Sequence, residues 1–134
     1  MSNTQILYTD GSCIPNPGKG GWGFVAFEGD IEWHVSGGEN HTTNNKMELT
    51  AVIKALEFCA KDRKDIKYII NTDSMYVINC AKGVWARKKN TILWEEFDKI
   101  SKGKNIEWVW VKGHSGNKYN EIVDKLCKKE SMDL

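Results

Sequence analysis

Two apolar runs constrain the fold of this chain more than any other feature of its sequence. Residues 5–10 and residues 67–73 are nearly apolar throughout, and they end in Asp10 and Asp73. Continuous apolar runs are typical of strands that other elements cover on both faces. We therefore expect a sheet with helices packed against it, and an acid where each of these two strands leaves the sheet.

Further strands are expected at residues 21–28, 31–36 and 106–111, which are apolar or alternate between apolar and polar residues. The first two of these segments are separated only by Gly29 and Asp30, a join that predicts a β-hairpin.

Helical periodicity predicts the remaining elements. From Asn44 onward, apolar residues recur at helical spacing on one face, at Leu49, Val52, Ile53, Leu56 and Cys59. Thr42 or Thr43 can serve as the N-cap of this helix. Three more helices are expected over residues 74–81, 91–101 and 117–130. The order of elements predicts an α/β fold, with a mixed five-stranded sheet made of an antiparallel hairpin and parallel strands and flanked by helices.

The composition fits one compact domain over residues 1–134, since 40% of the 134 residues are hydrophobic. No segment approaches the roughly 18 consecutive apolar residues of a membrane span, and the N-terminus lacks the pattern of a signal peptide. The four cysteines are widely separated and form no CxxC pair, which favours reduced thiols over a zinc site or a disulfide framework. We expect a cytoplasmic protein with no membrane partner, and a monomer because there is no heptad seam.

Four acids are candidates for one cluster. The carboxyl ends of neighbouring strands meet at one edge of an α/β sheet, so Asp10 and Asp73 are expected side by side. Glu48 and Asp124 lie among apolar neighbours in predicted helices. The alternative interpretation is that each acid is a helix cap or a solvated surface group, as most acids are.

A cluster of carboxylates has a chemical consequence. Neighbouring carboxylates raise each other's pKa values unless a cation lies between them. A ligand set made only of oxygen suits hard ions, Mg²⁺ or Mn²⁺. Two such ions about 4 Å apart can activate a water and stabilise the leaving oxygen in phosphodiester cleavage.

Four blocks of the sequence resemble the type 1 ribonucleases H: YTDGSCIPNPGKGGWG, TTNNKMELTAVIKAL, NTDSMYV and WVWVKGHSGNKYNEIVDKL. They occur in the order and at the spacing of that family, over nearly the whole chain. The resemblance implies a ribonuclease H-like fold and an endonuclease that hydrolyses the RNA strand of RNA–DNA hybrids without strong sequence specificity. It also implies two Mg²⁺ ions in the substrate complex, with Mn²⁺ as a substitute, and products with 5′-phosphate and 3′-hydroxyl ends.

The resemblance also implies catalytic roles. It makes Asp10, Glu48, Asp73 and Asp124 the four metal-binding acids. His114 matches the family's mobile histidine, which is thought to assist proton transfer or product departure, and its alternative is an ordinary surface-loop residue. Glu121 matches an acid implicated near the metal site and in product release.

Substrate contacts follow from the same resemblance. Asn16, Asn44, Asn45 and the main chain around Cys13 are expected to contact the hybrid across its minor groove, where amides can recognise ribose 2′-hydroxyl groups. The glycines after Asp10 would let the nucleic-acid backbone approach. The alternative for the asparagines is turn or N-cap duty, and both interpretations stay open for Asn44.

The DNA strand is expected to be held separately. Thr43 and Asn90 match residues that hold a DNA phosphate in relatives, and His41 lies where some relatives carry a phosphate-contacting arginine. Tyr76 and Trp85 match aromatic residues of the DNA channel, with buried packing as the alternative.

The sequence departs from many family members between Trp85 and Asn90. A basic, Trp-rich handle often lies there, but this chain has only residues 86–89. It resembles the handle-less form, and Arg87-Lys88-Lys89 can be interpreted either as a remnant of that basic surface or as a solvated face. The chain starts at the first strand, so we expect no hybrid-binding module before it.

Two other functions compete with this interpretation. A non-catalytic hybrid-binding module would use the same scaffold, but it has no need of repelling carboxylates. Another nuclease of the wider superfamily, such as a junction resolvase or an integrase core, would cleave DNA. The TTNN block favours RNA as the cleaved strand.

Overall fold

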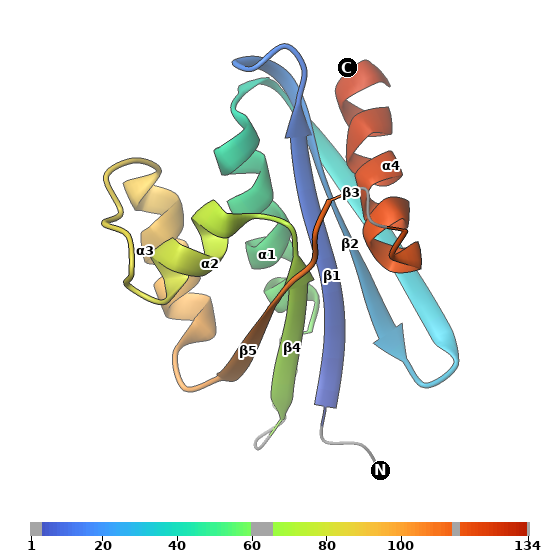
Figure 1. Cartoon of the computed structure of the whole chain (residues 1–134), viewed down its shortest axis with the longest axis vertical. Coiled ribbons are helices and arrows are strands. Elements are labelled where there is room, and N and C mark those ends of the chain that lie inside the picture. Colours follow the sequence, from blue (N-terminus) through green and yellow to red (C-terminus); the bar gives the residue numbers. More distant parts are fainter. Residues whose placement is uncertain (1–3, 60–65, 114–115, 134) are drawn as a thin grey trace.

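The computed structural model describes residues 4–59, 66–113 and 116–133 (Figure 1). Five strands form one sheet in the order β3-β2-β1-β4-β5. The strands are β1 (Thr4–Cys13), β2 (Gly18–Glu28), β3 (Ile31–Thr42), β4 (Lys67–Thr72) and β5 (Asn105–Trp110). The helices are α1 (Asn44–Phe58), α2 (Met75–Ala81), α3 (Thr91–Ser101) and α4 (Lys118–Asp133).

The sheet is mixed, as the sequence predicts. β2 pairs antiparallel with both β1 and β3, whereas β1 with β4 and β4 with β5 are parallel pairs. The two apolar strands are therefore neighbours. Their last paired residues are Tyr8 and Asn71, and the same register continued by two residues brings Asp10 level with Asp73.

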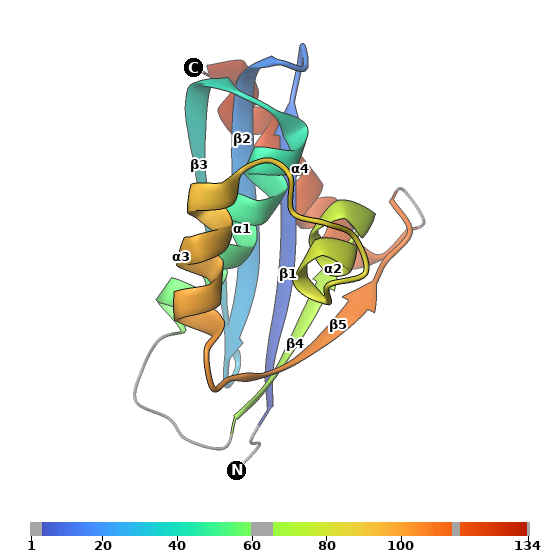
Figure 2. The ribbon, with the colours of Figure 1, turned by 90° about the vertical axis from the view of Figure 1, so that its left-hand side faces the viewer.

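The helices cover both faces of the sheet. Side chains alternate between faces along a strand, and two adjacent glycines of β2 identify what lies on each side. A Cβ on Gly20 would meet Met47 of α1, while a Cβ on Gly21 would meet Cys127 of α4. α2 and α3 lie with α1, opposite α4 (Figure 2). The core between the sheet and these helices includes Leu7, Phe24, Val52, Leu56, Ile70 and Trp94.

β1 is longer than the sequence predicts, and the expectation that Asp10 ends its strand is wrong. Residues 10–13 of β1 pair with residues 20–23 of β2, so the strand continues for three residues beyond Asp10. The glycines and the serine in these segments are typical of turns. Here they occupy strand positions because helices pack too closely for larger side chains.

The distances at these glycines change their interpretation. A Cβ on Gly11 would lie 2.3 Å from the main-chain nitrogen of Glu48, and one on Gly21 would lie 2.1 Å from the carbonyl oxygen of Cys127. At Gly11 and Gly21 the protein's own helices fill the space next to the main chain. The interpretation that these two glycines let a nucleic-acid backbone approach is therefore wrong. Their small size brings β1 and β2 close to both helices that carry acids.

Local capping explains where the helices begin. Thr43 caps α1, because its hydroxyl accepts a hydrogen bond from the main-chain N–H of Lys46. Ser74 caps α2 in the same way through the N–H of Val77.

Within residues 4–59, 66–113 and 116–133, no helix combines the length and apolar character that a bilayer crossing requires.

Candidate active site

Three acids from separate parts of the chain act electrostatically on a fourth, Asp10. Asp10 lies on β1, Asp73 directly follows β4, Glu48 lies on α1 and Asp124 on α4. The negative charges of the other three all act on the Asp10 carboxyl group. The structure thus brings together the four acids singled out in the sequence.

Asp10 is held in surroundings that disfavour its charged form. Its side chain is only 4% exposed. Burial is the largest cause that raises the pKa of Asp10 well above its ordinary value, and the charges of Asp73 and Glu48 come next. The main-chain N–H of Gly11 donates to Oδ1 over 2.9 Å and acts in the opposite direction. The net result is a buried acid whose charged form is disfavoured by its surroundings.

Glu48 is perturbed in the same direction. Burial raises its pKa to about 7, and the charge of Asp73 contributes, while a hydrogen bond with the Ser74 side chain lowers it. The other carboxylate oxygen, Oε2, is buried and has no hydrogen-bond partner among the described residues. A buried polar atom without a partner is costly, so this oxygen is suited to a ligand.

Asp124 has two neighbours on α4 that sequence reasoning did not connect to the site. Lys128 Nζ lies 3.0 Å from its Oδ2, an ion pair between positions i and i+4. Cys127 is fully buried, and its Sγ lies 3.7 Å from Asp10 Oδ2. Helical spacing was the available signal, because residues three and four positions after Asp124 share its face.

The donor set fits a hard divalent cation. The acids supply carboxylate oxygens only, the ligands that Mg²⁺ and Mn²⁺ prefer. A cation among them would offset their mutual repulsion and give the unpartnered oxygen of Glu48 a partner. Asp10 and Asp124 already place ligand atoms in one group that could hold a metal ion.

The predicted minor-groove residues form a hydrogen-bonded unit between the β1–β2 loop and α1. Asn44 is the first residue of α1, and its Oδ1 accepts from the main-chain N–H of Cys13. Its own main-chain N–H donates to Asn16 Oδ1 over 3.2 Å. The N-cap alternative for Asn44 is wrong, because Thr43 caps the helix. Asn16 and Asn45 are exposed.

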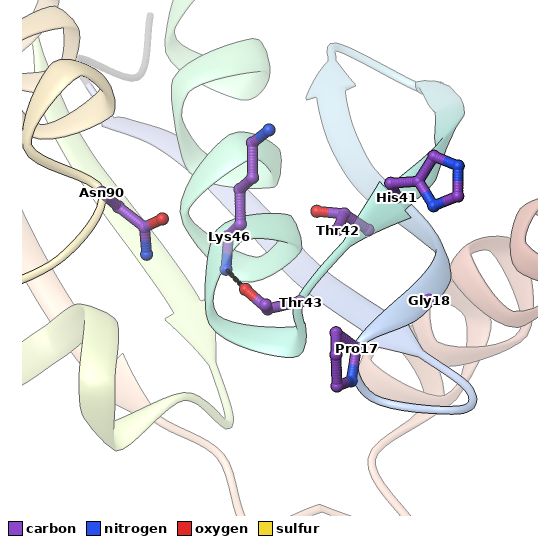
Figure 3. A pocket seen from close by; sticks show the side chains of 7 residues that line it. All are labelled: Pro17, Gly18, His41, Thr42, Thr43, Lys46 and Asn90. Carbon is purple, nitrogen blue, oxygen red and sulfur yellow. Dashed lines mark hydrogen bonds between the residues drawn. The ribbon is translucent and has the colours of Figure 1, made fainter.

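Thr43 and Asn90 line a common pocket of about 420 Å³ (Figure 3). Asn90 faces the other residues from across the hollow. His41 and Lys46 add two basic side chains to its lining. Lys46 was not singled out in the sequence, although its place three residues after the N-cap of α1 was a usable signal. The remaining lining residues are Pro17, Gly18 and Thr42.

Tyr76 holds Asn90 in place. The hydroxyl oxygen of Tyr76 accepts hydrogen bonds from Asn90 Nδ2 and from Trp94 Nε1, both over 3.0 Å. Asn90 has left-handed backbone angles, with φ of 57° and ψ of 35°, and its side chain does not cap α3. Trp85, by contrast, is 48% exposed, so the alternative of buried packing does not hold for it.

The segment between α2 and α3 is short and contains no helix, as the handle-less interpretation requires. The basic run within it divides into two kinds of residue. Arg87 is committed to the protein: its Nη1 bonds Asp98 over 2.8 Å, and its guanidinium lies 4.4 Å from the Trp94 ring centre. Lys88 and Lys89 are exposed. Of the three residues in this run, the two lysines remain as candidates for a basic contact surface.

His114 and Glu121 are the two remaining catalytic candidates. His114 lies outside the described residues. The preceding Gly113 lies close to the acids, since a Cβ there would be 3.1 Å from Asp73 Oδ2. Glu121 is exposed in the first turn of α4.

Comparison with known proteins gives one consistent result. The RNase H family model matches residues 2–132. The ribonuclease H of Ehrlichia ruminantium strain Gardel is 44% identical over 144 residues, covering 96% of this chain and 94% of that protein. The ribonuclease H of Francisella philomiragia subsp. philomiragia is 42% identical, covering 98% and 93%. The solved structure of LC11-RNase H1 in complex with RNA/DNA hybrid is similar with a TM-score of 0.82 at 25% identity, covering 96% and 97%.

Proposed function

The chain belongs to the ribonuclease H family, and we propose that it hydrolyses the RNA strand of RNA–DNA hybrids with two Mg²⁺ ions, without strong sequence specificity. The observation that carries this proposal is the group of four interacting acids, in which Asp10 and Glu48 have raised pKa values. Such an arrangement destabilises the metal-free protein and is suited to binding cations.

Each acid has a proposed role. Asp10 on β1 and Asp73 directly after β4 are level with each other when the register of these neighbouring strands is continued, and they serve as the central ligands. Glu48 is a further ligand and orients the ribose 2′-hydroxyl, while Asp124 completes the set. The bound ions would supply an activated water and stabilise the departing 3′ oxygen, which gives 5′-phosphate and 3′-hydroxyl ends. Mn²⁺ is the expected substitute, because it takes the same oxygen ligands.

His114 and Glu121 are proposed to assist the end of the reaction. Both lie in sequence close to the beginning of α4, and the chain just before His114 approaches Asp73. A histidine has an ordinary pKa of about 6.5, so it can exchange a proton near neutral pH. We propose that His114 helps proton transfer or product departure and that Glu121 aids release.

The two strands of the hybrid are proposed to bind at separate places. Asn16, Asn44, Asn45 and the main chain at Cys13 contact the minor groove, where amides and main-chain groups can read the 2′-hydroxyl groups. The pocket of Thr43 and Asn90 holds a DNA phosphate.

Three features of the described structure support the DNA-strand site. Lys46 and His41 line the pocket with basic side chains, and Tyr76 fixes the Asn90 amide. Tyr76 and the exposed Trp85 are also proposed to line the DNA channel.

Location and assembly also stay proposals. All four cysteines are free, which fits the reducing conditions of the cytoplasm. We propose a monomer, which size-exclusion chromatography with light scattering would test directly.

Cleavage of a labelled hybrid tests the proposed function. The RNA strand carries a 5′ label and is annealed to DNA, and the protein is added with Mg²⁺ or with EDTA. We expect Mg²⁺-dependent RNA fragments, and none from RNA–RNA or DNA–DNA duplexes. Tight hybrid binding without cleavage in Mg²⁺ or Mn²⁺ would instead indicate a binding module, and cleavage of the DNA duplex would indicate a different nuclease.

A further inference from the structure

A thiol lies inside the acid cluster. Cys127 Sγ, Asp10 and Asp124 each offer one ligand atom, and all three atoms lie within 4.8 Å of one another. Cys127 is fully buried and Asp10 is 4% exposed. The thiol is 3.7 Å from Asp10 Oδ2 and 3.2 Å from the Asp124 main-chain oxygen.

This geometry suits a different class of ion from Mg²⁺. Mg²⁺ takes oxygen ligands, whereas Zn²⁺ and similar soft ions combine thiolate and carboxylate ligands. In tetrahedral coordination, a Zn–S bond of about 2.3 Å and a Zn–O bond of about 2.1 Å put the two ligand atoms about 3.6 Å apart. The observed separation of 3.7 Å between sulfur and Asp10 Oδ2 is close to that value.

A second observation points to a cation at this place. Glu48 Oε2 is buried without a hydrogen-bond partner among the described residues, and the Glu48 charge acts on Asp10. Glu48 is not one of the three residues of the group, but its charge adds to the negative potential at Asp10 that a cation would offset. Among the described residues, Lys128 is the cation paired with the Asp124 carboxylate, and it lies on the same helix, 41% exposed.

We propose that Cys127 makes the acid cluster a binding site for thiophilic divalent cations such as Zn²⁺ or Cd²⁺, with Asp10 and Asp124 as its oxygen ligands. On binding, the metal–sulfur bond forms as the thiol proton leaves to solvent. These ions then occupy the place proposed for Mg²⁺ and compete with it. Soft ions bind such mixed sites more tightly than Mg²⁺ does, so a small concentration is sufficient.

Cd²⁺ provides a direct test, because a Cd²⁺–thiolate bond has an ultraviolet charge-transfer band. The metal-free protein is titrated with Cd²⁺ as wild type, as Cys127→Ser and as Cys127→Ala. We expect a saturable band in the wild type that is absent from both variants, and a loss of Cd²⁺ affinity of at least about tenfold. Cys127→Ser keeps the shape of the side chain, and thermal unfolding without metal verifies that each variant is folded.

Cys80→Ala is the matched control, since Cys80 is also buried but lies on α2. It should keep the wild-type band, whereas Asp10→Asn should weaken it. A band of equal size in Cys127→Ala would overturn the proposal, as would no band in the wild type.

The inference rests on the acids of the proposed function, but the absorption test does not require cleavage. If the wild type shows no Mg²⁺-dependent cleavage, the proposed function is contradicted, and the Cd²⁺ result is unaffected. If both hold, Cd²⁺ should inhibit cleavage, and added Mg²⁺ should relieve the inhibition.

Discussion

The acid cluster and the junction around Arg87, which is the segment between α2 and α3, differ in how their charges are arranged. At the junction, Arg87 binds Asp98, donates to the Cys80 carbonyl and stacks on Trp94. In the cluster, Asp10 is buried beside three other acids. Charges of opposite sign join α2, α3 and the segment between them, whereas the clustered acids repel one another, a cost that protonation or a bound cation relieves. The difference separates residues that stabilise the fold from residues kept for chemistry.

The same substitution in the two regions gives the largest contrast. We expect Asp10→Asn to reduce hybrid cleavage by at least about a thousandfold, because it removes a central ligand. Asp98→Asn should leave cleavage unchanged and cost less than about 1 kcal/mol of stability, since the pair is on the surface. Single-turnover cleavage rates and thermal unfolding measure both effects. Retained cleavage in pure Asp10→Asn would remove the acids from the mechanism.

Stability against pH sharpens the contrast. The pKa of Glu48 is about 7 in the folded protein against an ordinary 4.5. A raised carboxyl pKa gives stabilisation that is complete below about pH 4.5 and lost as pH rises through 7. We expect the metal-free protein to lose about 3 kcal/mol of unfolding free energy from this group by pH 8.

Glu48→Gln isolates that contribution. Its stability should fall less than that of the wild type between pH 4.5 and 8, as measured by urea unfolding in EDTA. Parallel curves for the two proteins would show that Glu48 titrates as an ordinary surface acid. Mg²⁺ should restore wild-type stability at pH 8, because the ionised site binds it.

The junction has its own prediction. Arg87→Ala should cost about 1–2 kcal/mol of stability, through the lost stacking on Trp94 and the lost hydrogen bonds. Lys88→Ala is the control, since Lys88 is exposed and should change stability by less than about 0.5 kcal/mol. Urea unfolding compares the two. An equal effect of both variants would mean that Arg87 is only another surface cation.

Lys128 gives the smallest expected effect. Its ammonium pairs with Asp124, so it competes with a metal ion for that carboxylate. We expect Lys128→Gln to raise Mg²⁺ affinity about two- to fivefold, the range of a pair worth under about 1 kcal/mol. The Mg²⁺ dependence of the unfolding temperature reports it. A weaker affinity would show instead that Lys128 orients Asp124 for binding.

The order of elements and the acid cluster were predictable from sequence because both rest on local patterns. The apolar runs and helical spacing indicate the elements, and four motif blocks bring one acid each. The length of β1 was not predictable, because Gly11 resembles a turn residue until α1 is seen against it. The contact between Asp10 and Cys127 joins residues 117 positions apart, so it needs the tertiary fold.

The most direct test of the account is thermal unfolding of wild type and Asp10→Asn at pH 8 over a series of Mg²⁺ concentrations. In EDTA the variant should unfold at a higher temperature by about 3–5 °C, a shift typical of roughly 1 kcal/mol. Added Mg²⁺ should raise the unfolding temperature of the wild type and leave the variant nearly unchanged. A variant that is less stable in EDTA, or that Mg²⁺ stabilises equally, would contradict the claim that these acids are held for a cation.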